Sequence, residues 1–357
     1  MRIGLHHQYE TISHKNLTVS VVVAARNEED CIYDCLTSLS KLDYPAELLE
    51  IIIVNDRSVD HTDHIISQFI KDKPCFKYFN VKEVNKNLSG KASAVSMGIE
   101  KSRGEIIFVT DADCVVPISW IRGTLSYFRS DIGLVAGFTL IKAAKGLFSR
   151  LQNIDWAYLL SVASGAIGLK IPLTCMGNNF AVRRSTYDKI GGYEGAGFSL
   201  TEDFALLKAI ADSTDWKITF PVDSDCLVKS MPLTSLKDFF SQRKRWAIGG
   251  NSVHWFGKFL IFLSIITHFT LIGFLFSSLY FHFIFVLVLI LLSDYILLKY
   301  AMKRLKLSKF IKYLPFYKIF FVFYLILLLI QLILNQKITW KGIIYTSDEV
   351  IGNKQMD

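Results

Sequence analysis

The sequence predicts an α/β protein with an open, mostly parallel sheet and flanking helices, followed by transmembrane helices. Two observations predict this class. Between residues 17 and 110, short β-branched runs alternate with helical patterns, as they do in parallel sheets. Residues 259–298 contain one acidic residue and no Lys or Arg, which fits two membrane spans of about 20 residues each.

Four runs predict the strands of this sheet. Leu17–Ala25 (LTVSVVVAA) is continuously apolar and β-branched, which is typical of a parallel strand buried on both faces. Further runs of this kind occupy residues 50–54, 76–81 and 105–110. Helical patterns separate the strands: they follow ARNEED and NDRSVD and cover residues 90–102.

The last predicted strand runs into two aspartates in the stretch FVTDADC. Two carboxylates this close repel each other, and a divalent cation would compensate them. The chain also contains Asp223-Ser-Asp225, so the pattern alone is not diagnostic. Ligands bind beyond the carboxyl ends of parallel strands, which favours Asp111 and Asp113 as functional, whereas the second pair follows Pro221 in an expected surface turn.

Polar residues also follow two other predicted strands. Arg26 and Glu28 come after the first and Asp56 after the second, so three polar clusters should converge on one cleft. No G-x-G-x-x-G or G-x-x-x-x-G-K-[ST] pattern follows a strand, which disfavours a dinucleotide enzyme or a P-loop NTPase. The six cysteines show no metal-ligand spacing.

The C-terminal part predicts the topology. A third apolar run, Ile319–Asn335, reaches spanning length with its flanking residues. Residues 299–318 carry seven Lys or Arg and no acid, so the positive-inside rule places them in the cytoplasm, and residues 1–258 with them. The net charge of +8 then reflects a membrane surface and not nucleic-acid binding.

Two stretches before the spans have the pattern of interfacial helices. Residues 147–162 place apolar side chains on one helix face, and residues 235–258 mix apolar with basic side chains around QRKRW. The expected division is a cytoplasmic catalytic domain (1–234), an interfacial segment (235–258), a transmembrane region (259–337, with spans near 259–277, 279–298 and 317–337) and a tail (338–357).

Eight short motifs occur in order along the chain: VVVAARNEE (21–29), VNDRSVD (54–60), GKASAVSMG (90–98), TDADC (110–114), GNNFAVRR (177–184), GGYEG (191–195), TEDFAL (201–206) and QRKRW (242–246). With these motifs the chain resembles the membrane-integral family-2 glycosyltransferases of the GT-A fold. Ala24 stands where that family often has proline, and no counterpart of the gating-loop motif of cellulose-synthase-like enzymes follows QRKRW.

The resemblance implies a role for each candidate residue. Asp203 would be the general base, and Asp113, with Asp111, would bind Mg²⁺ or Mn²⁺. The implied donor-binding residues are Ala25, Arg26, Glu28, Asp56, Lys91, Asp111 and Arg245. The implied acceptor-binding residues are Glu202, Gln242 and Trp246.

The expected function is inverting transfer of a sugar from a UDP-sugar to a membrane lipid or lipid-linked acceptor, in the inner membrane of a bacterium. A processive polysaccharide synthase and an inactive membrane scaffold on the same fold are the alternatives. Two residue-level alternatives also stand. Thr201, Glu202 and Asp203 could be an ordinary helix N-terminus, and QRKRW could belong to an interfacial helix without catalysis.

Overall fold

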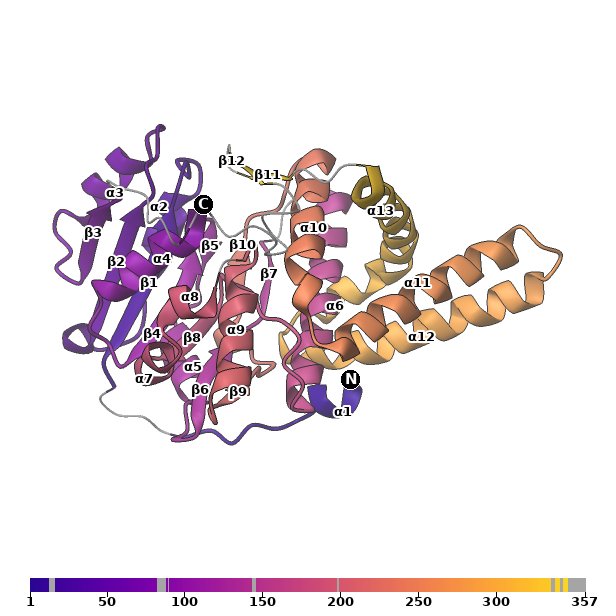
Figure 1. The fold of residues 1–357 in the computed structure, drawn as a ribbon, viewed down its shortest axis with the longest axis horizontal. Coiled ribbons are helices and arrows are strands. Elements are labelled where there is room, and N and C mark those ends of the chain that lie inside the picture. Colours follow the sequence, from indigo (N-terminus) through magenta and orange to yellow (C-terminus); the bar gives the residue numbers. More distant parts are fainter. Residues whose placement is uncertain are drawn as a thin grey trace. The chain divides into compact units, whose positions relative to one another are not determined.

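The structure is a computed structural model that describes residues 1–357 except 13–16, 82–87, 89, 143–145, 198, 335–337, 341–342 and 346–357. The contacts divide the chain into two compact units (Figure 1). The sheet unit comprises residues 7–142 and 174–231, and the helical unit comprises residues 1–6, 143–173 and 232–357. Residues 1–6 and 143–173 thus group with the apolar helices, although the sequence analysis includes them in the catalytic region. The assignment of catalysis to residues 1–234, as a domain separate from residues 235–357, stays a prediction.

A seven-stranded sheet forms the centre of the sheet unit, in the order β3-β2-β1-β4-β8-β6-β9. The first four of these strands are parallel, β8 is antiparallel to both neighbours, and β9 is parallel to β6. The predicted open, mostly parallel sheet is therefore confirmed. The strands are β1 (Val19–Ala25), β2 (Leu49–Asn55), β3 (Phe76–Asn80), β4 (Ile106–Asp111), β6 (Ile132–Ala136), β8 (Phe180–Arg183) and β9 (Lys217–Thr219).

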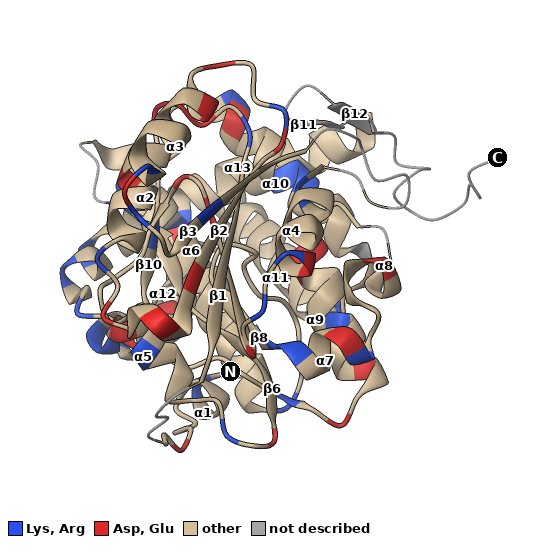
Figure 2. Ribbon diagram, turned by 90° about the vertical axis from the view of Figure 1, so that its left-hand side faces the viewer, with Lys and Arg blue, Asp and Glu red and all other residues tan. Residues whose placement is uncertain are grey.

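Helices cover both faces of this sheet. Consecutive residues Val21, Val22 and Val23 of β1 are all fully buried, which explains why the strand is continuously apolar and not alternating. Figure 2 shows β1 at the centre of the sheet without a charged residue. The helices are α2 (Ile32–Leu39), α3 (Thr62–Ile70), α4 (Gly90–Glu100), α5 (Trp120–Leu125), α7 (Arg184–Lys189), α8 (Gly192–Ala196) and α9 (Glu202–Ser213).

A second, small sheet has the order β5-β10-β7. Its strands are β5 (Cys114–Val115), β7 (Thr139–Ile141) and β10 (Val228–Ser230). Because β5 directly follows the Asp-Ala-Asp stretch and pairs with β10, this sheet fixes the position of Asp113. Short 3₁₀ helices at Ala46–Leu48 (η1) and Ser224–Cys226 (η2) complete the sheet unit.

The helical unit contains three helices that are long and apolar enough to cross a membrane: α11 (Trp255–Leu275), α12 (Tyr280–Arg304) and α13 (Leu314–Leu334), the last continuous with the 3₁₀ helix η4 (Ser308–Tyr313). The three predicted apolar segments therefore form helices. Figure 1 shows α11 and α12 as an antiparallel hairpin, whereas α13 packs on α6 (Leu147–Gly168) and α10 (Leu236–Gly249).

Helix α6 differs from the predicted interfacial helix. An interfacial helix buries one face only, but Asp155, Trp156 and Ser161 are buried along with Leu151 and Ile154. The reason is that α6 contacts α1 (Arg2–Leu5), α12, α13 and η4, which surround it. The helical unit also contains η3 (Gly250–Ser252) and two short antiparallel strands, β11 (Ile338–Trp340) and β12 (Ile343–Tyr345).

Candidate active site

The ends of β1, β2 and β4 meet at one edge of the sheet. The register pairs Ala25 with Asn55 and Ala24 with Asp111. The three polar clusters predicted at these strand ends therefore do lie next to one another, because adjacent parallel strands that start in register also end together.

Asp56 is buried and ion-paired directly after β2. It is 5% exposed. Its Oδ2 lies 3.5 Å from Arg26 Nη1 and its Oδ1 lies 2.9 Å from Arg57 Nε. Its backbone N–H donates to the carbonyl of Ala25 at 2.8 Å, which ties the loops after β1 and β2 together. Glu28 belongs to the same junction, since its N–H donates to Thr62 Oγ1 at 2.8 Å.

Lys91 joins two of the predicted motifs. Its ammonium lies 2.5 Å from Asp111 Oδ1 and 3.1 Å from Glu202 Oε1, and it donates to the carbonyl of Gly177 at 3.3 Å. Burial by itself lowers the pKa of Lys91, but the charges of Asp111 and Glu202 outweigh burial and raise that pKa above its usual value. Lys91 is therefore a fully charged cation that compensates the carboxylate at the end of β4.

Asp113 is oriented by the small sheet. Ser230 Oγ donates to its Oδ2 at 3.1 Å, and Cys114 Sγ donates to its Oδ1 at 3.2 Å. Burial, and then the charges of Asp113 and Asp111, raise the pKa of the Cys114 thiol, so it stays protonated. The donors available to a metal here are carboxylate oxygens, which suit Mg²⁺ or Mn²⁺.

The described part of the chain holds no group of three or more His, Cys, Asp or Glu side chains that could bind a metal by themselves. Two carboxylates still fit a Mg²⁺-type site, because such ions are commonly held by one or two carboxylates together with substrate phosphates and water. The residues therefore fit a cation that arrives with a diphosphate.

Asp203 lies in the first turn of α9 and links this helix to the loop that contains Gly177. Its Oδ2 accepts the N–H of Gly177 at 2.5 Å, while its Oδ1 accepts the N–H of Phe204 at 2.8 Å. Thr201 is the N-cap by position but makes no side-chain capping bond. A Cβ at position 177 would lie 3.1 Å from both Lys91 Nζ and the Asp203 carboxylate, so glycine permits this close approach.

The sequence analysis assigned no role to Asn178 and Asn179, although GNNFAVRR contains them. The Asn178 carbonyl accepts the Thr110 hydroxyl at 2.9 Å. The Asn179 amide donates to the carbonyls of Phe138 and Cys226 at 2.7 and 2.9 Å. These buried bonds hold the loop that presents Gly177 to Asp203. The Gly-Asn-Asn run just before a strand could have indicated this role, because asparagine amides commonly form hydrogen bonds with backbone groups in loops.

The Asp223 pair has the predicted structural role of a turn. Asp223 Oδ1 accepts the N–H of Asp225 at 3.0 Å and its Oδ2 accepts the Tyr127 hydroxyl at 2.7 Å. It thereby caps η2, as expected of an Asp at the start of a turn.

The QRKRW residues lie on α10, in the helical unit. Arg243 is 6% exposed and is ion-paired with Asp155, which also accepts the hydroxyls of Tyr317 at 2.7 Å and Tyr324 at 3.1 Å. Its guanidinium lies 4.3 Å from the ring centroid of Trp246. Arg243 is therefore held inside the helical unit and is not a solvated charge on the surface of α10.

Gln242 and Trp246 flank this buried arginine. The Gln242 side-chain oxygen accepts from Arg243 Nη1 at 2.7 Å. The Trp246 ring also packs on Trp156 of α6, with ring centroids 5.8 Å apart. Arg245 lies on the same helix between them. The candidate residues thus divide between the units: those numbered 25–203 are in the sheet unit, and Gln242, Arg245 and Trp246 are in the helical unit.

Two family models match the chain. The model of glycosyl transferase family 2 matches residues 20–191, and that of glycosyl transferase family group 2 matches residues 106–334, which is more than half of the chain. The chain belongs to the family-2 glycosyltransferases. Its predicted family and fold class are thus confirmed.

Curated relatives of this family-2 glycosyltransferase include three proteins that share about 30% identity. A probable glycosyltransferase of Bacillus subtilis is 33% identical over 239 residues, which are 66% of this chain and 56% of that protein. A poly-β-1,6-N-acetyl-D-glucosamine synthase of Staphylococcus epidermidis is 29% identical over 66% of this chain and 55% of its own. A β-monoglucosyldiacylglycerol synthase of Synechocystis is 30% identical over 65% and 47%. The chain spans about half the length of these relatives.

Among solved structures, a mannosyltransferase from Pyrobaculum calidifontis in complex with GDP-Man and Mn²⁺ is similar in fold. The TM-score is 0.57 at 16% identity, and the match covers 88% of this chain and 91% of that one. At this identity the likeness concerns the fold alone.

Proposed function

We propose that this family-2 glycosyltransferase moves a sugar from a UDP-sugar to a lipid or lipid-linked acceptor at the cytoplasmic face of a membrane, with inversion at the sugar carbon. The observation that carries the proposal is the ammonium of Lys91. It joins the carboxylate at the end of β4 to Glu202 at the start of α9, so the implied donor site and the implied base belong to one cluster. The apolar helices α11, α12 and α13 support a membrane acceptor.

Donor binding is assigned to the loops after β1, β2 and β4. Asp56, fixed by Arg26 and Arg57, would accept hydrogen bonds from the nucleoside, next to Ala25 and Glu28. The Lys91 ammonium, which is paired with Asp111, would also contact the donor's phosphates. The Arg245 guanidinium is proposed to bind the diphosphate as well. Asp113 and Asp111 would hold Mg²⁺ or Mn²⁺, which when bound offsets the negative charge of the leaving diphosphate.

Asp203 is proposed as the general base. Its carboxylate would take the proton of the acceptor hydroxyl while that oxygen bonds to the sugar carbon, and the bond to the diphosphate breaks so that UDP leaves with the electron pair. The N–H groups of Gly177 and Phe204 keep the carboxylate in one orientation beforehand. Glu202 in the sheet unit, and Gln242 and Trp246 in the helical unit, are each proposed to bind the acceptor, Trp246 through its indole ring.

A processive polysaccharide synthase is the second candidate, because one group of relatives is named for making a polymer. The number of sugars in the product distinguishes single transfer from processive synthesis. The full chain in phospholipid nanodiscs would be given labelled UDP-sugars, Mn²⁺ and a membrane lipid extract, and the products read by mass spectrometry. Lipids that carry one added sugar are expected. A polymer would reject single transfer, and no sugar-containing product from any donor would favour the inactive scaffold.

A further inference from the structure

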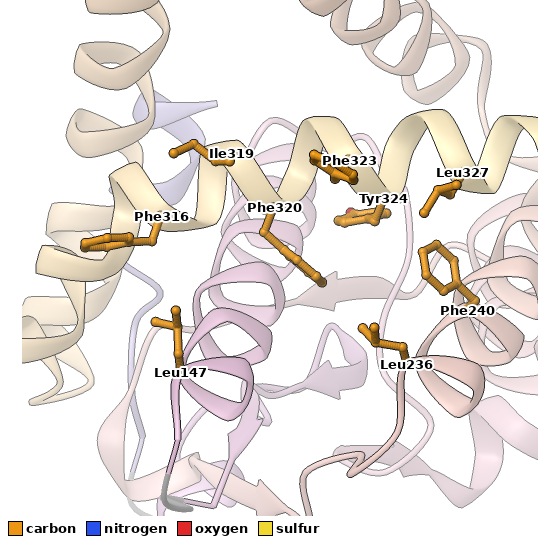
Figure 3. Close-up of a pocket in the computed structure, with 9 residues that line it drawn as sticks. All are labelled: Leu147, Leu236, Phe240, Phe316, Ile319, Phe320, Phe323, Tyr324 and Leu327. Carbon is orange, nitrogen blue, oxygen red and sulfur yellow. The ribbon is translucent and has the colours of Figure 1, made fainter.

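An apolar groove of about 390 Å³ lies within the helical unit (Figure 3). This volume falls in the range of ~300–1,000 Å³ typical of small-molecule sites. Leu147 at the start of α6 and Leu236 and Phe240 in the first turns of α10 line one side. Figure 3 shows the row from Phe316 to Leu327 on α13 facing them.

The groove offers no free hydrogen-bonding group to a ligand. Among the lining residues only Tyr324 has a polar side-chain atom, and its hydroxyl donates to Asp155 at 3.1 Å. A polar ligand would lose its hydration here without compensation, which costs several kcal/mol per group. The occupant must therefore be a hydrocarbon over the length of the groove.

The open side of the groove points to a lipid as the source of that hydrocarbon. Ile319 and Phe323 are each 68% exposed, on a helix that is long and apolar enough to cross a membrane. Large exposed apolar side chains on such a helix are covered by bilayer lipid. The groove is continuous with this exposed row, so a chain can enter it from the bilayer without crossing water.

The wall formed by α10 links the groove to the QRKRW motif. Trp246 lies six positions after Phe240, a distance of about 9 Å along a helix. A lipid whose chain fills the groove would have its head group near the QRKRW residues of α10.

We infer that the groove binds one acyl chain of the acceptor, a diacyl glycerolipid with a free hydroxyl. The choice of acceptor rests on the proposed function. The groove would hold the lipid at the protein before the sugar is transferred, so its occupation does not require the donor.

Photo-crosslinking tests the binding without any sugar transfer. Diacylglycerol with a diazirine on one acyl chain would be placed with the full chain in phosphatidylcholine nanodiscs, irradiated without nucleotide sugar, and the adducts mapped by mass spectrometry. Adducts are expected on the groove segments of α6, α10 and α13. Leu327→Trp, which fills the groove, should reduce them at least fivefold, whereas Leu289→Trp on α12, a similarly exposed leucine outside the groove, should not.

A kinetic arm measures the consequence. With diacylglycerol as acceptor, Leu327→Trp should raise its KM at least fivefold while kcat stays within twofold, and Leu289→Trp should change neither. The inference is overturned if diazirine-phosphatidylcholine labels the groove as strongly as diacylglycerol, if a polyprenyl phosphate probe labels it more strongly, or if the two tryptophan variants behave alike. Groove labelling without any transfer would reject the proposed function only, and lipid glycosylation without groove labelling would reject the groove only.

Discussion

Lys91 lies between two carboxylates that belong to separate sequence motifs. Asp111 comes from TDADC and Glu202 from TEDFAL, and each lies within 3.1 Å of the ammonium. The Asp-Ala-Asp pattern predicts a divalent cation that compensates the aspartates, and in the structure Lys91 already compensates Asp111. The site therefore contains a permanent positive charge before any donor binds.

Lys91→Gln should destabilise the sheet unit by about 3 kcal/mol, since removal of one partner leaves the buried Glu202 and the partly buried Asp111 without their counter-charge. The raised pKa of Lys91 means that its contribution is fully present below the unfolded lysine pKa of about 10.4 and is lost only above it. Thermal unfolding from pH 6 to 9 should therefore show a constant difference between wild type and variant. Lys208→Gln, which removes an exposed pair with Asp212, should cost under about 0.5 kcal/mol.

The two lysine variants also test donor binding. UDP affinity, measured by calorimetry with Mn²⁺, should fall for Lys91→Gln and stay unchanged for Lys208→Gln. Equal loss of stability in both variants would contradict the buried role of Lys91.

Asp203 and Asp113 should have different roles, Asp203 in proton transfer and Asp113 in metal binding. Asp203→Asn should lower turnover about 10²–10⁴-fold while UDP and metal binding stay nearly intact, because only the proton acceptor is lost. Asp113→Asn should instead weaken Mn²⁺-dependent UDP binding. The measurements are UDP affinity with and without Mn²⁺ and initial rates for each variant.

Asp223→Asn is the control for this series, because its carboxylate is bonded to Tyr127 and to the backbone of Asp225. It should change neither UDP affinity nor rate. An Asp203→Asn enzyme that loses UDP binding while Asp113→Asn keeps it would reject the assignment of the metal site to the end of β4.

At the scale of elements, a buried ion pair fixes α10 on α6 and α13. Asp155 of α6 is ion-paired with Arg243 of α10. It also accepts hydrogen bonds from the hydroxyls of Tyr317 and Tyr324 of α13. Arg243 is in turn stacked on Trp246. The orientation of the implied acceptor platform thus depends on a carboxylate almost ninety residues earlier in the chain.

Arg243→Met should lower the stability of the helical unit by about 3–5 kcal/mol, because it leaves Asp155 buried and without its cation. Arg150→Met is the matched control on α6: this arginine bonds to the Tyr313 hydroxyl at 2.5 Å and is only partly buried, so about 1 kcal/mol is expected. Thermal unfolding in detergent micelles measures both.

The double variant Asp155→Leu/Arg243→Met separates an unpaired charge from lost packing. It should be more stable than Arg243→Met alone, because no buried charge remains. A double variant less stable than either single one would show that the pair contributes mainly through packing and the tyrosine hydrogen bonds.

At the scale of the whole molecule, the basic segment between α12 and α13 predicts the orientation in the membrane. Ser278 in the α11–α12 loop and Ser308 in the basic segment are both exposed serines. With the partly exposed Cys31 and Cys75 replaced by serine, Ser278→Cys should react with a membrane-impermeant maleimide in intact spheroplasts, and Ser308→Cys only after lysis. The reverse pattern would place the catalytic residues outside the cytoplasm.

The sequence by itself determined the parallel sheet, the apolar helices and the family. Strands such as β1 are recognisable because burial on both faces demands an unbroken β-branched run, and a segment of forty residues with a single charged side chain is long and apolar enough for two membrane spans. The end of β4 was predictable as a ligand edge because strand direction fixes where carboxyl ends meet. These features depend on local composition and order, which the sequence displays directly.

Only the tertiary structure decided which distant residues touch. The ion pairs of Lys91 with Asp111 and Glu202, and of Arg243 with Asp155, join residues separated by up to 111 positions, and no local pattern marks them. The packing around helix α6 was not predictable for the same reason. Its apolar spacing was read correctly, but burial of its other faces depends on which helices pack around it, and that is a property of the folded chain.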